Sequence, residues 1–138
     1  MKSKLARRAI AGTSALAGIL GLGLAAAPAA NAAAAYNGAC GSGYAVVNSM
    51  AIGTKGMTYL TYNSSTGKNC AVTIRNTPGA ATRMIVLINV TGTDRTVVDD
   101  ATYTTYAGPV YINASGSCVT WVGNLLGASN SKIGTNCG

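Results

Sequence analysis

The chain has 138 residues, of which 49% are hydrophobic, and its ten basic side chains outnumber its three acidic ones. It contains no histidine and no glutamate, so its only carboxylate side chains are Asp94, Asp99 and Asp100. This composition excludes Ser-His-Asp and Cys-His nucleophilic systems, which need an imidazole base, and leaves too few ligands for a catalytic zinc.

The first 32 residues are predicted to be a secretory signal peptide. A positively charged start precedes the uncharged stretch 9–27, which a proline and the small-residue run Ala30-Asn31-Ala32 follow. These are the three parts of an export signal with an A-x-A cleavage site. An N-terminal membrane anchor is disfavoured because the most apolar part, 15–27, is shorter than the ~20 residues that span a bilayer. We therefore expect a signal peptide over 1–32 and a secreted β domain over 33–138.

The mature chain has the pattern of short strands separated by turns. Segments rich in Val, Ile, Thr and Tyr are bounded by turn sequences such as Asn76-Thr77-Pro78-Gly79. The predicted strands are 44–47, 57–62, 70–75, 83–90, 96–98, 103–106, 110–113 and 118–122. Their spacing predicts an all-β fold, a small disulfide-stapled β-sandwich or barrel.

Two local patterns add detail to the all-β prediction, an apolar run and two short segments with helical character. Within 83–90, the run from Met84 to Ile88 leaves no polar face, which predicts a central strand covered on both sides. Only Asn124–Ala128 and the region around Ala80-Ala81 could form a helical turn.

All four cysteines lie in the mature part, namely Cys40, Cys70, Cys118 and Cys137. An even count in a short exported chain predicts disulfides, and a metal site is disfavoured because there is neither a CxxC pair nor a histidine. Four cysteines allow three pairings, and sequence alone does not choose among them. We favour Cys40–Cys70 and Cys118–Cys137 because 67–73 and 116–121 look alike. Each places a glycine-containing turn before a cysteine that opens a strand, and each such cysteine has one partner toward a chain end.

The charge of the mature domain is modest. Without the signal, six basic side chains remain against three aspartates, a net charge of +3. The basic residues are scattered along the chain, at Lys55, Lys68, Arg75, Arg83, Arg95 and Lys132. A nucleic-acid binder needs a clustered basic face, so no nucleic-acid partner is predicted. No later stretch is long enough to span a bilayer, so no membrane association is expected after cleavage.

We predict no catalytic, cofactor-binding or metal-binding residues, no cofactor and no enzymatic activity. A glycosidase needs two carboxylates that face each other across a cleft, whereas Asp99 and Asp100 are adjacent and point to opposite faces of a strand. Together with Asp94 they could supply oxygens to a calcium ion. The favoured interpretation is an acidic turn exposed to solvent.

The aromatic residues are seven tyrosines and one tryptophan, without phenylalanine. Such side chains have an apolar body and a polar tip, so they suit half-exposed platforms that stack on sugar rings or pack against another protein. Cross-strand tyrosine pairs on a sheet are the favoured alternative.

Several short segments spread over nearly the whole mature chain form a further pattern. They are 36–44, 67–70 with Val72-Thr73 and Arg75-Asn76, 106–111, Cys118 with Trp121, and 134–138. Together they resemble the spore-associated protein A family of filamentous actinobacteria. The resemblance implies export and association with the surface of spores or aerial hyphae. It implies no enzymatic activity and no known binding residues.

The predicted function is that of a secreted non-enzymatic surface protein, with the spore or cell-wall surface as its partner. The alternative is a secreted binding module or antimicrobial-type effector that acts on cell-wall glycans or on a competitor. A third hypothesis is a small protease inhibitor that presents the loop 76–80. The sequence leaves the oligomeric state open.

Overall fold

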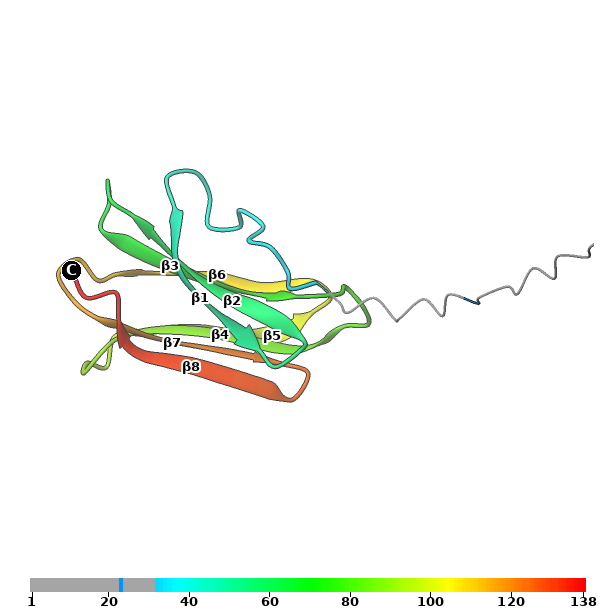
Figure 1. Ribbon diagram of the computed structural model, residues 1–138. Helices are drawn as coiled ribbons and strands as arrows, with labels where there is room; N and C mark the ends of the chain where they lie inside the picture. Colours follow the sequence, from blue (N-terminus) through cyan, green and yellow to red (C-terminus); the bar gives the residue numbers. More distant parts are fainter. Residues whose placement is uncertain (1–22, 24–31) are drawn as a thin grey trace, which may run out of the picture.

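The chain forms two four-stranded antiparallel sheets that pack face to face (Figure 1). The computed structural model describes residues 23 and 32–138. The predicted signal peptide, 1–32, therefore lies outside the described residues except at those two positions. The strands are β1 (Ala45–Ile52), β2 (Gly56–Asn63), β3 (Lys68–Arg75), β4 (Thr82–Val90), β5 (Thr96–Tyr103), β6 (Tyr106–Asn113), β7 (Val119–Leu125) and β8 (Ala128–Thr135). The described residues contain no helix, which confirms the all-β prediction and makes the fold a sandwich.

The first sheet has the strand order β1-β2-β3-β6, and the second has the order β5-β4-β7-β8. Hairpins join β1 to β2, β2 to β3, β4 to β5 and β7 to β8, whereas the chain changes sheet after β3, β5 and β6. Successive strands run in opposite directions. The connections after β1, β3, β5 and β7 therefore lie at one end of the sandwich, and those after β2, β4 and β6 at the other (Figure 1).

Alternating side chains from both sheets form the core between the layers. In β4, Met84, Val86 and Ile88 are fully buried, and Trp121 of β7 is fully buried beside them in the same cluster. The indole N–H of Trp121 donates to Oγ1 of Thr135 at 2.9 Å, so the polar tip of this ring is satisfied. The period of two along each strand puts these residues on one face.

β4 is central in its sheet, between β5 and β7, as predicted. The expectation that it is covered on both sides is wrong, because Ile85 and Leu87 on its outer face are only half-buried. Val98, which pairs with Leu87, is 54% exposed on the same outer face. The fold has two layers, and no third layer covers this face within the described residues.

The helical turn considered possible at Asn124–Ala128 does not form. β7 runs to the end of Leu125, and the two-residue turn Leu126-Gly127 leads into β8. Both turn residues have positive φ, 52° and 78°, which a tight hairpin with a type I′ turn requires. The region around Ala80-Ala81 forms no helix either, and a bend at 104–105 divides the strand predicted at 103–106 between β5 and β6.

Candidate functional site

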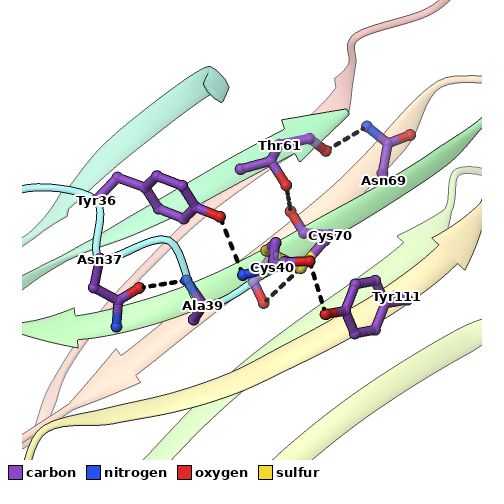
Figure 2. The surroundings of a disulfide bond; sticks show 9 residues. Tyr36, Asn37, Ala39, Cys40, Thr61, Asn69, Cys70 and Tyr111 are labelled. Carbon is purple, nitrogen blue, oxygen red and sulfur yellow. Dashed lines mark hydrogen bonds between the residues drawn. A yellow bond between two sulfur atoms is a disulfide. The ribbon is translucent and has the colours of Figure 1, made fainter. Parts of the chain in front are cut away.

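An N-terminal strap, residues 32–44, lies across the outer face of the first sheet. The Cys40–Cys70 disulfide ties this strap to β3 (Figure 2). Val72 and Ile74 share with Cys70 the face of β3 that points away from the second sheet, yet both are buried. The strap therefore acts as a cover for this face and allows apolar residues on both sides of β3.

Tyrosine hydroxyls hold the strap in place. Tyr59 on β2 donates to the carbonyl oxygen of Ala34, and Tyr111 on β6 donates to that of Cys40 at 3.0 Å. Tyr36, on the strap itself, accepts a hydrogen bond from the backbone N–H of Cys40 at 3.1 Å (Figure 2). The polar tips of these rings are thus engaged inside the protein, which favours a structural role for them.

The tyrosine rings also pair between the strap and the sheet. The centroids of Tyr36 and Tyr59 lie 5.7 Å apart, and those of Tyr44 and Tyr111 lie 5.5 Å apart with an edge-on geometry. Burial, followed by the proximity of Tyr44 and Tyr36, raises the pKa of Tyr111. Both of these tyrosine pairs join the sheet to the strap, so they differ from the cross-strand pairs that the sequence favoured.

The second disulfide, Cys118–Cys137, ties the end of the chain to the connection between β6 and β7. The backbone N–H of Gly116 also donates to the carbonyl oxygen of Gly138 at 3.3 Å. Both disulfides have the pairing favoured from the sequence, and no cysteine is free among the described residues. Each bridge anchors one terminal segment of the β domain.

Of the three aspartates expected in a solvated turn, Asp94 lies in the exposed turn between β4 and β5, whereas Asp99 and Asp100 are within β5. Asp100 accepts two hydrogen bonds from Arg83, at 2.7 and 2.6 Å, and this pairing lowers the pKa of Asp100 and raises that of Arg83. Asp99 accepts the hydroxyl of Tyr103 and, at 2.7 Å, the backbone N–H of Gly108. In the part of the chain that the structure describes, no group of three potential metal ligands occurs.

An open cavity of about 480 Å³ lies at the end of the sandwich that carries the connections after β1, β3 and β7. Its lining consists of Thr54, Lys55, Arg75, Asn76, Thr77, Pro78 and Leu126. Two of these side chains are cationic and none is a carboxylate. We call this feature the basic cavity.

Arg75 is fixed at the wall of the basic cavity. Its Nη1 donates to the carbonyl oxygen of Ala80 at 2.8 Å. A Cβ on Gly79 would lie 2.7 Å from Nη2, so the absence of a side chain there lets the guanidinium pack against the loop. Nε of Arg75 is buried without a hydrogen-bond partner among the described residues. A buried donor left in this state costs about 1–3 kcal/mol.

Asn76 is hydrogen-bonded to three segments around the basic cavity. Its backbone N–H donates to the carbonyl oxygen of Lys55 at 2.8 Å, and its Nδ2 donates to that of Thr54 at 3.1 Å. Its Oδ1 accepts the backbone N–H of Ala34, at the start of the strap, at 2.8 Å. The cavity thus joins a turn, a loop and the N-terminal strap at one point.

Sequence reasoning treated the basic residues as scattered and missed this cavity. Lys55 and Arg75 are 20 positions apart, but β2 pairs with β3 so that Gly56 lies opposite Arg75, next to Lys55. The predicted strands 57–62 and 70–75 already formed a hairpin pattern. Pairing them in register would have brought the two cations together. In the loop 76–80, residues 77–80 are exposed and residues 76–78 line the cavity. The proposed inhibitory role of this loop stays a prediction.

Within the described residues, no helix is long and apolar enough to cross a membrane. No protein-family profile matches the chain, and no solved structure matches it. It is similar to Spore-associated protein A of Streptomyces coelicolor, with 49% identity over 137 residues that cover 95% of this chain and 89% of the relative. Identity at this level over nearly the full length of both proteins means that the chain belongs to the spore-associated protein A family.

Proposed function

We propose that the chain is a secreted, non-enzymatic protein that adheres without a covalent bond to the surface of spores or aerial hyphae. The observation that carries this proposal is the 49% identity to a relative named spore-associated protein A. The pair of disulfides agrees with an oxidising location outside the cytoplasm.

The chemistry of the side chains supports a role without catalysis. The chain has no imidazole, and two of its three carboxylates, Asp99 and Asp100, are engaged by tyrosine, backbone and arginine donors. The contribution of such a domain is the surface that it presents. A net charge of +3 gives a weak attraction to the anionic polymers of a bacterial wall, and salt screens this attraction. Apolar and aromatic contacts are expected to supply the remainder.

Fractional washing of purified spores tests the proposal. Spores are washed in buffer, in about 1 M NaCl, where the Debye length is about 3 Å, and in detergent or mild denaturant, and each eluate is blotted. We expect partial release by salt and complete release by detergent or denaturant. A protein that stays wholly in the medium and never fractionates with spores contradicts surface association and favours a diffusing effector.

A further inference from the structure

We infer that the basic cavity is a binding site for oxyanions, the phosphate or carboxylate groups of a surface polymer. The oxyanion site stands on the structure alone, whereas its assignment to a polymer of the spore or cell wall rests on the proposed function. The inference starts from the two cations, Lys55 and Arg75, which the β2–β3 register places side by side.

Three of the other cations, Arg83, Arg95 and Lys132, are engaged by the protein, whereas Lys68 is exposed at the opposite end of the sandwich. Arg83 is paired with Asp100, and Lys132 donates to Oδ1 of Asn48 and packs over the ring of Trp121. Lys55, by contrast, is exposed, and neither it nor Arg75 makes an ion pair among the described residues. Lys55 and Arg75 therefore place two positive charges at the basic cavity, and none of the residues that line it is a carboxylate.

The wall of the basic cavity is preorganised for an anion. The hydrogen bond to Ala80 and the close packing against Gly79 hold the guanidinium of Arg75 in place before any ligand arrives. Arginine pairs well with carboxylate and phosphate because its planar group presents several donors with fixed geometry. Asn76 and Thr77 line the same cavity and add polar groups beside the two cations.

Processing of the chain is expected to add a third positive charge. Cleavage after Ala32 would create a new amino terminus at Ala33, one residue before Ala34, whose N–H is bound by Asn76 at 2.8 Å. An α-amino group has an ordinary pKa of about 7.7–8.0, so it is mostly protonated at neutral pH. Because Asn76 lines the basic cavity, export would bring this charge beside Lys55 and Arg75.

An NMR titration of the isotopically labelled protein, purified from culture medium, tests the site. Inorganic phosphate and acetate are added separately at low ionic strength. We expect amide shifts concentrated at 54–55 and 75–77, and an affinity about threefold weaker after Lys55→Gln. Lys68→Gln is the matched control, since it removes the same charge at the start of β3, at the opposite end of the sandwich. It should leave the affinity unchanged.

The two anions distinguish the two sources. Tighter phosphate binding indicates a phosphate-bearing polymer, and tighter acetate binding indicates a polymer of carboxylates. Shifts that are absent from the cavity, or equally strong around Lys68 and Arg95, overturn the inference. Spore washing of the same variants separates this result from the proposed function. If wild type binds phosphate at the cavity but never fractionates with spores, the surface role is wrong and the oxyanion site stands.

Discussion

The carboxylate of Asp99 holds the corner at which the chain passes from the second sheet to the first. It accepts the hydroxyl of Tyr103 from its own strand, at 2.6 and 2.8 Å, and the backbone N–H of Gly108 from β6. β5 and β6 belong to different sheets, so these contacts join the layers along one edge. A residue that sequence reasoning assigned to a solvated turn is therefore structural.

We expect the Tyr103→Phe variant to lose less stability than the wild type as the pH rises into the alkaline range. The hydrogen bond to Asp99, then burial and the charge of Asp99, raise the pKa of Tyr103 above its ordinary value of 10.0. The unfolded chain therefore loses this proton first as the pH rises. The stabilisation from the neutral hydroxyl is complete below pH 10 and is lost as the pH rises toward the folded pKa.

Thermal unfolding between about pH 8 and pH 11 measures this effect. The wild-type midpoint should fall more steeply above pH 10 than that of the variant. Tyr106→Phe, which removes a hydroxyl from β6 without touching Asp99, controls for the loss of one tyrosine. Parallel curves for wild type and Tyr103→Phe would contradict the role of this hydrogen bond.

Gly123 of β7 packs tightly against side chains of the opposite sheet. A Cβ at this position would lie 2.0 Å from Oγ1 of Thr58 and 2.9 Å from Cδ1 of Ile52. Thr58 and Thr73 share a buried hydrogen bond of 2.8 Å between their hydroxyls, directly under this glycine. Glycine is therefore required here for space, because no atom beyond Cα fits against the opposite sheet.

We expect Gly123→Ala to lower the free energy of unfolding by about 1–3 kcal/mol, the usual cost of overpacking a core. Urea denaturation measures this change. Thr58→Ala removes the nearest clashing atom, so the double variant should be more stable than the sum of the two single changes predicts. Strict additivity in this double-mutant cycle would show that the clash with Thr58 is not the cause.

At the scale of elements, the strap gives β3 two buried faces. Ala71 and Thr73 face the second sheet, and Val72 and Ile74 face the strap, and all four are buried. A sheet in a two-layer sandwich normally leaves its outer face to solvent, as β4 does. The Cys40–Cys70 bridge explains the difference, since it closes the strap over this sheet.

We expect loss of the Cys40–Cys70 bridge to destabilise the domain more than loss of Cys118–Cys137. The bridges span 30 and 19 positions, so the entropy of loop closure alone differs by only about 0.4 kcal/mol within a total of about 2–4 kcal/mol each. Removing the first bridge also releases the cover over Val72 and Ile74.

Urea denaturation and amide hydrogen exchange of the two Cys→Ala pairs test this difference. Exchange in β3 should accelerate selectively in the variant that lacks Cys40 and Cys70. The variant that lacks Cys118 and Cys137 is the matched control, because it also loses one bridge. Equal losses of stability with unchanged protection of β3 would contradict the role of the strap as a cover.

At the scale of the whole molecule, the two ends of the sandwich carry different features. The start of the strap lies at one end, and the C-terminus lies at the other (Figure 1). The basic cavity is at the first of these ends, and the Cys118–Cys137 bridge is at the second. If the predicted cleavage after Ala32 occurs, it changes the charge at the cavity end. At the opposite end, the Cys118–Cys137 disulfide ties the end of the chain to the connection between β6 and β7.

We expect the protein recovered from culture medium to begin at or near Ala33. The reason is the charged start, apolar stretch and small-residue run before this position. Intact-mass spectrometry of the supernatant protein, with and without reduction, gives the cleavage site and the number of bridges. Recovery of the full-length chain in the membrane fraction would contradict the prediction.

Much of this architecture can be predicted from the amino-acid sequence. The strand at Cys70–Arg75 follows from alternating side chains, and the strand at 83–90 follows from a continuous apolar run. The disulfide pairing followed from two similar turn-and-cysteine segments. The lack of imidazole chemistry follows directly from composition. β8 was missed because it is polar and lies at a sheet edge, where half-exposure removes the apolar pattern.

The features that concern function required the tertiary structure. Lys55 and Arg75 lie close together only because of the register between β2 and β3. Asp99 accepts the N–H of Gly108 only because the chain folds back at the corner between the sheets. Likewise, Val72 and Ile74 are both buried only because a strap 30 positions away is tied over them. Periodicity and turn chemistry act between near neighbours in the chain and therefore appear in the sequence. A cavity or a cover depends on contacts between distant segments, which only the packed structure brings together.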